Sequence, residues 1–296
     1  MMKLRIKYKM RAPVSHIGET SSTGSYFQTV LTANGRLPVI TGNSIRGQIR
    51  DSMAMHLLDL LGVKVSKDTF NILFSGGNIN GAMKDDVEKA KNVREKLPLV
   101  SLLGGGLGDM IMAGKLLVSF AYPVCIESWD ITGIPSEVSW HSLIDEIEFT
   151  RTDDGKNDTK SEYMENVSEE KTAKASTQMR FEVQYMAAGT EFVQDFIFMD
   201  GTTDMEFGAF YAGIRKWFET PRIGGMAAKG FGFFDAEITN KDTVVMTVKN
   251  GNITVDDAVT DLISRYEAHI LAQGSTALTA LDAKEKKKNG KANKSD

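Results

Sequence analysis

The chain has 296 residues, of which 42% are hydrophobic, and a formal net charge of −4. This length and composition predict a globular protein with a sizeable core, and the charge lacks the overall basic balance of most nucleic-acid binders. No apolar run is long enough to span a bilayer, and the basic start of the chain has no apolar stretch of the secretory type. We therefore expect a cytoplasmic protein without a membrane partner.

Metal and disulfide chemistry find little support in the residue types. Cys125 is the single cysteine, which excludes an internal disulfide and a multi-cysteine zinc site, and its apolar surroundings favour a core thiol. The four histidines are scattered, and His56 has no second ligand three or four places away. We expect no metal, no cofactor and no catalytic residue.

The first predicted element is a strand over residues 3–11, KLRIKYKMR, in which basic and apolar residues alternate. This period of two predicts one buried face and one face that carries a row of positive charge. That row has two interpretations, a solvated strand blunted by lysine or a surface for phosphates. An irregular polar loop follows.

Residues 37–40 predict a short strand, and residues 44–61 predict a helix with apolar residues four apart. Between them lies a glycine turn, GNSIRGQI, with the glycine spacing of a phosphate-binding P-loop. Gln48 and Ile49 stand where that motif needs Lys and Ser or Thr, so the sequence argues against nucleotide hydrolysis.

The same turn still has the physical features of an anion site at a helix N-terminus. Asn43 or Ser44 is expected to cap the helix, and Arg46 and Arg50 lie one turn apart, as two phosphate contacts would. The alternative is an ordinary capped helix with surface arginines.

Further along the chain, strand and helix patterns are segregated rather than strictly alternating, which favours an α+β fold with helices on a sheet. A polar segment from Glu127 to Met179 is too long for a simple loop and indicates an excursion with its own function. The remaining expected elements are one or two buried strands in 110–124, a strand hairpin in 180–200, a helix over 205–219, a strand after the glycine turn 222–230, and an amphipathic helix over 254–274.

Residues 229–236, KGFGFFDA, match part of an RNA-recognition signature whose aromatic side chains stack on bases. The final aromatic position is occupied by Ala236, and an earlier strand lacks a convincing partner motif. Phe231, Phe233 and Phe234 fit a buried strand equally well.

Taken in order, three motifs resemble the RAMP superfamily of CRISPR proteins, and in particular the backbone subunit of type III and type IV effector complexes. These motifs are His16-Ile17-Gly18, the stretch LPVITGNSIRGQIRDSMA, and the late RIGGMAAKGFGFF. The resemblance implies a modified RRM/ferredoxin-like palm with a helical insertion and a protruding thumb hairpin. It implies a single domain over 1–278, with the helical insertion at 62–110, the thumb at 149–179 and a disordered lysine-rich tail at 279–296.

The resemblance also implies that the protein polymerises along guide RNA, holds its phosphates and displays its bases for pairing. The expected partners are guide RNA, a DNA or RNA target, further copies of the chain and other effector subunits. The implied RNA contacts are His16, Asn43, Ser44, Arg46, Arg50, Arg222, Gly224, Gly225 and Lys229, with thumb contacts at Arg151, Lys156, Lys160, Lys171 and Lys174, among which acidic residues are interleaved.

One departure from the family pattern bears on catalysis. Type III relatives that cut target RNA place an aspartate in the loop before the LP strand, whereas residues 19–36 contain no Asp and only one acid, Glu19. We therefore expect a binding subunit without nuclease activity, closest to the type IV proteins. Two alternatives remain, a metal-independent RAMP endoribonuclease that processes guide RNA with His16 as acid or base, and a single-copy structural or adaptor protein.

Overall fold

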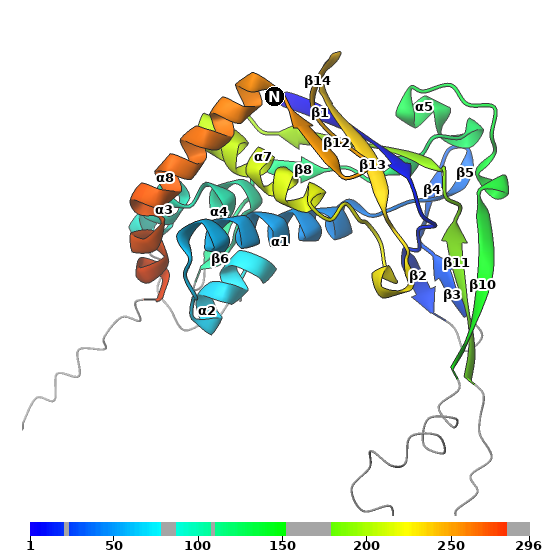
Figure 1. Cartoon of the computed structure of the whole chain (residues 1–296), viewed down its shortest axis with the longest axis horizontal. Coiled ribbons are helices and arrows are strands. Elements are labelled where there is room, and N and C mark those ends of the chain that lie inside the picture. The colour runs from blue at the N-terminus through cyan, green and yellow to red at the C-terminus, as the bar shows by residue number, and fades with distance from the viewer. Residues whose placement is uncertain (21–23, 78–86, 108–109, 152–178, 283–296) are drawn as a thin grey trace, which may run out of the picture.

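The computed structural model describes residues 1–20, 24–77, 87–107, 110–151 and 179–282. Its central sheet has the strand order β15-β14-β13-β1-β12-β8, with β9 paired to β12 beside β8 (Figure 1). The bounds of these strands are β1 Met2–Met10, β8 Leu116–Val118, β9 Tyr122–Pro123, β12 Glu191–Phe198, β13 Phe234–Asn240, β14 Thr243–Lys249 and β15 Asn252–Val255.

The core of this sheet has a ferredoxin-like topology. In chain order the elements are β1, α1 (Gly42–Leu61), β8, β12, α7 (Asp204–Phe218) and β13, which is a β-α-β-β-α-β sequence. In space the four strands lie in the order β13-β1-β12-β8, and each neighbouring pair is antiparallel. The expected α+β palm is therefore confirmed.

One face of the sheet is covered by helices, as the alternation in β1 predicts. Leu4, Ile6 and Tyr8 are fully buried on this face, and the Tyr8 hydroxyl donates to Gln194 Oε1 at 2.8 Å. Helix α7 packs closely on α1 and on α8 (Asp257–Asp282) because two of its residues are glycines. A Cβ on Gly213 would lie 2.1 Å from Met53, and the structure leaves no room for one.

Residues between α1 and β8 form a helical lobe on the same side of the sheet as α8 (Figure 1). Helix α8 reaches Asp282, so the helix continues past residue 279, where the tail was expected to begin. The lobe contains α2 Lys67–Phe70, the π-helical turn Asn71–Ser75, α3 Val87–Lys96, α4 Pro98–Leu103 and the short strands β6 Gly105–Leu107 and β7 Met110–Met112.

A second sheet, with the order β10-β11-β3-β2, extends from the opposite end of the molecule (Figure 1). The expected hairpin in 180–200 is wrong, because its first strand, β11, pairs with β10 and β3, whereas its second strand, β12, belongs to the central sheet. Near this sheet lie a small ribbon, β4-β5, and three short helices. The bounds are β2 Ile17–Thr20, β3 Gly24–Phe27, β4 Thr29–Thr32, β5 Gly35–Pro38, β10 Ile144–Arg151, β11 Met179–Met186, 3-10 helices Ile126–Ser128 and Trp140–Ser142, and α5 Trp129–Thr132.

Candidate nucleic-acid interface

The two glycine corners predicted from the sequence meet on either side of one dipeptide, Ser15-His16. The Gly225 amide donates to the Ser15 carbonyl at 2.7 Å, and the Thr41 amide donates to His16 Nε2 at 3.2 Å. Residues some 180 positions apart in the chain are thereby joined through two consecutive residues. The junction lies just beyond the C-terminal end of β1, between the central sheet and the second sheet (Figure 1).

Thr41 is the cap of helix α1, in place of the expected Asn43 or Ser44. Its side chain accepts the Ser44 amide, and its hydroxyl lies 3.2 Å from His16 Nε2. Two donors therefore face the same ring nitrogen, which must be unprotonated to accept from the backbone amide. Burial lowers the pKa of His16 from its ordinary 6.5, which keeps the imidazole neutral at pH 7. His16 thus anchors the start of α1 to the end of β1.

The second corner needs glycine for two reasons. Gly224 has φ of +76°, which a side chain disfavours, and a Cβ there would lie 2.3 Å from the Ser15 carbonyl oxygen. The following 3-10 turn, Ala227–Lys229, is closed by Gly230 with φ of +85°, where nothing lies within 4 Å of an added Cβ. The first glycine allows close approach of two backbones, and the second only reverses the chain.

The junction exposes polar and basic groups on its surface. Asn43, Arg222 and Lys229 are exposed, and Ser44 is half-buried. Within the described residues, neither Arg222 nor Lys229 forms an ion pair with a carboxylate. Among the described residues, the second corner therefore has two surface cations without a carboxylate partner.

Lys229 also joins the second corner to the second sheet. Its Nζ lies 3.9 Å from the ring centroid of Phe149 on β10 and 4.3 Å from that of Phe181 on β11, and these two rings stack on each other. Cation–π contacts of this kind favour one position of the ammonium without neutralising its charge. Lys229 of the second corner therefore contacts both strands of the β10–β11 hairpin.

Arg50 does not lie where its expected role requires. The side chain is 6% exposed, and its guanidinium donates to the carbonyls of Leu103 at 3.0 Å and Gly104 at 2.9 Å. Its pKa is lowered to about 10 by burial and by the neighbouring Arg46, which still leaves it charged at pH 7. Arg50 caps the C-terminal end of α4 inside the helical lobe, so the expectation that it contacts phosphate is wrong.

Arg46 lies between the two environments. Its side chain is half-buried and also donates to the Leu103 carbonyl, and burial lowers its pKa. The helix spacing predicted that Arg46 and Arg50 would both contact phosphates. Of the two, only Arg46 reaches the surface.

The aromatic motif after the second corner is largely core. Phe234 is fully buried against Tyr8 and Trp217, and Phe231 is 6% exposed beside Tyr185 and Phe149. Only Phe233 of the three is exposed. Of the two interpretations of this motif, the buried strand fits the structure better than a base-stacking face.

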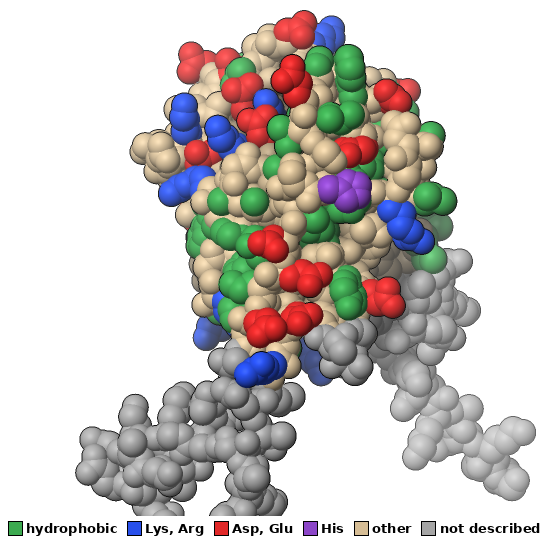
Figure 2. Space-filling view, turned by 90° about the vertical axis from the view of Figure 1, so that its right-hand side faces the viewer, with side chains coloured by type: hydrophobic (Ala, Val, Ile, Leu, Met, Phe, Trp, Pro, Cys, Tyr) green, Lys and Arg blue, Asp and Glu red, His purple; other side chains and the backbone are tan. Residues whose placement is uncertain are grey.

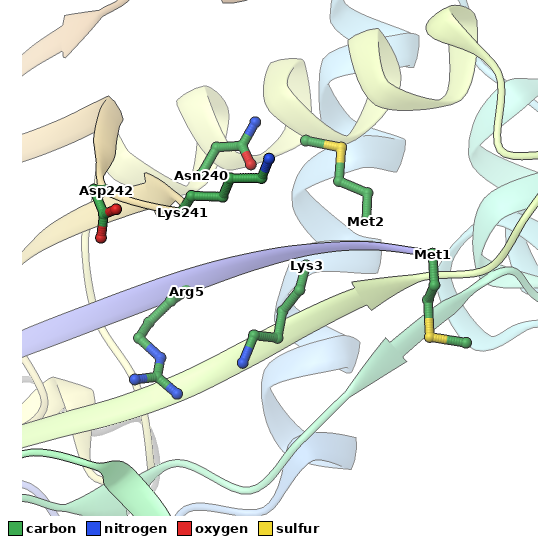
Figure 3. Close-up of a pocket in the computed structure, with 7 residues that line it drawn as sticks. All are labelled: Met1, Met2, Lys3, Arg5, Asn240, Lys241 and Asp242. Atoms are coloured by element: carbon green, nitrogen blue, oxygen red, sulfur yellow. The ribbon is translucent and has the colours of Figure 1, made fainter.

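The basic row on β1 is paired within the sheet. Lys3 and Arg5 both contact Asp195 on β12, and Lys7 contacts Glu191. A shallow pocket at the start of β1 is also lined by basic residues, and Figure 3 shows Lys3 and Arg5 leaving the same side of the strand. This pocket, completed by Lys241 and its neighbours in the β13–β14 turn, lies at the end of β1 opposite to the junction. The solvated interpretation of the row therefore fits better.

Most of the expected thumb contacts lie outside the residues that the structure describes. Arg151 is the last residue of β10, and β10 and β11 pair in register from Ile144↔Met186 to Arg151↔Met179. Strand β10 therefore leads into the expected thumb segment, 149–179, and strand β11 leads out of it. Lys156, Lys160, Lys171 and Lys174 lie outside the described residues.

Sequence reasoning missed three residues of the junction. Ser15 is fully buried, and its hydroxyl donates to the Gln184 carbonyl on β11 at 3.1 Å, which attaches the second sheet. Thr41 directly precedes the glycine of the turn, so the preference of Thr for helix caps could have identified it. Phe149 carries no signal of its contact with Lys229, because the two residues are 80 positions apart.

The described residues offer no site for a metal ion. They contain no group of three or more His, Cys, Asp or Glu side chains arranged to hold one. No helix in the described segments has the length and apolar content to cross a membrane.

By its architecture the protein is a ferredoxin-like palm with a lateral hairpin sheet and a glycine corner before its last core strand. A family profile described as "RAMP superfamily" matches residues 7–235. The chain therefore belongs to the RAMP superfamily.

Among solved structures, a chain of one titled "Type IV-B CRISPR Complex" has a similar fold, with a TM-score of 0.63 and 17% sequence identity. The similarity covers 82% of this chain and 92% of the other. No curated protein matches the sequence.

Proposed function

We propose that the protein is a non-catalytic subunit of a CRISPR effector complex, which binds guide RNA through its phosphates and repeats along it in several copies. The observation that carries the proposal is the Ser15-His16 junction, which brings the two glycine corners of the family together beside the hairpin. Membership of the superfamily and the fold of a chain in a type IV-B complex support the effector assignment.

The arrangement of charges supports phosphate binding rather than base reading. Arg222 and Lys229 are exposed at the corner, and exposed Asn43 stands at the N-terminus of α1. Phosphate contacts fix the position of a strand and leave base edges free, so sequence can be read by pairing with the target nucleic acid. A target of either DNA or RNA, and other effector subunits, would complete the assembly.

The surroundings of His16 support a binding role over the alternative of guide-RNA cleavage. An acid or base in catalysis must exchange a proton with the substrate, and Nε2 of His16 already accepts from the Thr41 amide. Among the described residues, Glu19 is the only carboxylate on β2 through β5. Incubation with repeat RNA and with target RNA should therefore leave both uncut.

Salt-dependent RNA affinity tests the phosphate contacts. In the double variant Arg222→Ala/Lys229→Ala, the slope of log affinity against log salt should flatten by about 1.4, since each phosphate contact on a single strand contributes about 0.7. Lys241→Ala is the matched control, because this exposed lysine lies in the β13–β14 turn at the other end of the sheet. A double variant that binds with the slope of the parent would contradict the proposed site, and a parent that does not bind RNA would refute the function.

A further inference from the structure

An exposed phenylalanine lies close to the C-terminal end of β1, on the face of the central sheet opposite to α1 and α7. Phe234 is fully buried against α7, so its neighbour Phe233, which is 36% exposed, points to the opposite face. The same alternation turns exposed Arg11 away from buried Met10. Phe233 and Arg11 therefore share the face that these helices leave uncovered.

Backbone pairing places Phe233 between two arginines. On one side, the amides of Arg11 and Ala12 both donate to the Phe233 carbonyl, at 2.8 and 3.2 Å, which is the pattern of a β-bulge. On the other side, Phe233 forms an antiparallel bridge with Arg222, flanked by backbone hydrogen bonds of 2.9 and 3.1 Å. Residues that face each other in such a bridge have their side chains on the same face. We name Arg11, Phe233 and Arg222 the Phe233 row.

The Phe233 row combines an aromatic ring with positive charge. Arg222 is exposed and has no carboxylate partner among the described residues. The Arg11 side chain is 46% exposed, and its contact with Asp235, at 3.8 Å, is a long one for an ion pair. Within the same described part of the chain, no other ring stacks on Phe233. A single exposed Phe is ordinary on a protein surface, but a ring between two cations offers the two contacts that bind a nucleotide, stacking and charge.

The Phe233 row adjoins the junction. The chain passes from Arg11 to Ser15 in four residues, and between them the Pro13 carbonyl accepts the Gly232 amide at 2.7 Å. The turn that leads into Phe233 is therefore fixed to the same segment that carries Ser15-His16. A strand of nucleic acid held at the junction reaches the row without a change of direction around another element.

The end of the molecule that carries α5 does not suit a nucleic acid. Figure 2 looks at this end, and acidic and hydrophobic side chains cover much of the middle of the view, while most Lys and Arg side chains lie toward its edges. Residues 116–150, which include α5, contain six acids and no Lys or Arg. Because such a surface repels phosphates, a bound strand is expected to leave the junction along the Phe233 row rather than across this end.

We propose that the Phe233 row binds one single-stranded nucleotide of the RNA at the junction, with the base stacked on the Phe233 ring and the adjoining phosphates on Arg11 and Arg222. Every base has an aromatic face, so such a site accepts a nucleotide of any sequence. The site has one ring, unlike the multi-aromatic face of an RNA-recognition motif, because Phe231 and Phe234 belong to the core. This inference deepens the proposed function and rests on it.

Phe233→Leu is the decisive variant, because leucine keeps an apolar side chain for folding and removes the ring. The affinity for a single-stranded RNA oligonucleotide, measured by fluorescence anisotropy, should fall at least about fivefold, the lower bound for the loss of one stacked base. The slope of log affinity against log salt should equal that of the parent, because no charge is removed. Phe233→Trp keeps an aromatic face and should bind as the parent does. Phe70→Leu is the matched control, at a phenylalanine of α2 that is 47% exposed, and should also bind as the parent does.

The arginines of the row should show the opposite signature. Arg11→Ala should flatten the salt slope by about 0.7, the contribution of one phosphate contact on a single strand. Lys241→Ala, at the other end of the sheet, should leave the slope unchanged. Thermal unfolding of each variant within a few degrees of the parent establishes that folding is intact.

Photochemical crosslinking gives a readout that needs no variant. The parent is irradiated with RNA in which 5-iodouridine replaces uridine, and mass spectrometry should locate a crosslink at Phe233. That crosslink, together with a loss of affinity at unchanged slope in Phe233→Leu, supports the inference. A Phe233→Leu protein with the affinity of the parent, or crosslinks confined to other residues, overturns the inference and leaves the proposed function standing. A parent that binds no RNA at all would refute the proposed function and this site with it.

Discussion

Arg50→Ala should destabilise the protein and leave its electrostatic affinity for RNA unchanged. The side chain forms two well-placed hydrogen bonds, to Leu103 O at 3.0 Å and Gly104 O at 2.9 Å, and a third contact to Ile72 O at 3.5 Å. Hydrogen bonds to a charged donor contribute about 1.5–3 kcal/mol each, and the variant leaves the carbonyl of buried Gly104 without its arginine donor, while Leu103 O keeps Arg46. Counting only the two short bonds at the lower value, we expect a loss of about 3 kcal/mol in the free energy of unfolding.

A loss of this size is readily measured. At roughly 2 °C per kcal/mol for a domain of this length, the melting temperature should fall by about 6 °C. Arg50→Lys keeps the charge without the planar fork of donors and should recover only part of the stability. Circular dichroism melting and urea unfolding would give both values.

Arg46→Ala is the matched comparison, because this half-exposed arginine shares the Leu103 carbonyl. Its loss should lower the free energy of unfolding by less than about 1 kcal/mol. If Arg46 also touches the RNA, the salt slope measured by fluorescence anisotropy should flatten by about 0.7. An Arg50→Ala protein that melts with the parent and shows the flattened slope would place Arg50 on the RNA surface and refute the buried arrangement.

Three further predictions concern the junction. Gly224→Ala should lower the free energy of unfolding by about 2 kcal/mol or more and weaken RNA binding, because φ is positive and the new Cβ meets the Ser15 carbonyl. Gly230→Ala should lower the free energy of unfolding by only about 1 kcal/mol, so equal melting temperatures of the two variants would contradict this reasoning. Because burial lowers the pKa of His16, its stabilising contribution is complete above about pH 6.5 and falls as the pH drops and the ring protonates, so His16→Asn should reduce the difference in melting temperature between pH 7.5 and pH 5. Lys229→Met should lower the melting temperature by no more than about 2 °C, as expected for a surface cation–π contact, and should flatten the salt slope of RNA affinity by about 0.7. A slope equal to that of the parent would show that Lys229 contacts only Phe149 and Phe181 and does not bind RNA.

The strand and helix patterns were predictable because they depend on local periodicity. The alternation in residues 3–11 gives the buried face of β1, and the fourfold spacing after residue 44 gives the buried side of α1. The strands of residues 180–200 were placed correctly, but their pairing was not. Alternation is the same whichever sheet a strand joins, and the turn at Ala187–Thr190 leads the chain from one sheet to the other.

The fate of Arg50 shows why site residues are harder to predict than elements. Arg50 lies one helical turn from Arg46 on α1. This spacing is the same whether that face of the helix is exposed to solvent or packs against another segment. Here α4 ends against it, and the decisive contacts come from Leu103 and Gly104, more than 50 positions away. Sequence periodicity assigns a face to a helix, but only tertiary packing determines what covers that face.

The junction shows the opposite case, in which a local rule carries long-range information. Gly224 and Gly42 were singled out as turns, yet each is also a point of close backbone approach, since a Cβ on Gly42 would lie 2.2 Å from the Val118 carbonyl. Gly224 lets the second corner approach the Ser15 carbonyl, and Gly42 lets the start of α1 approach β8, while Thr41 beside Gly42 makes the contact with His16. A strand of nucleic acid that crosses this junction would touch parts of three elements, the end of β1, the start of α1 and the turn before β13, which the same two residues hold in register. Perturbing Ser15-His16 should thus weaken contacts at both corners together, which distinguishes one shared interface from two separate anion sites.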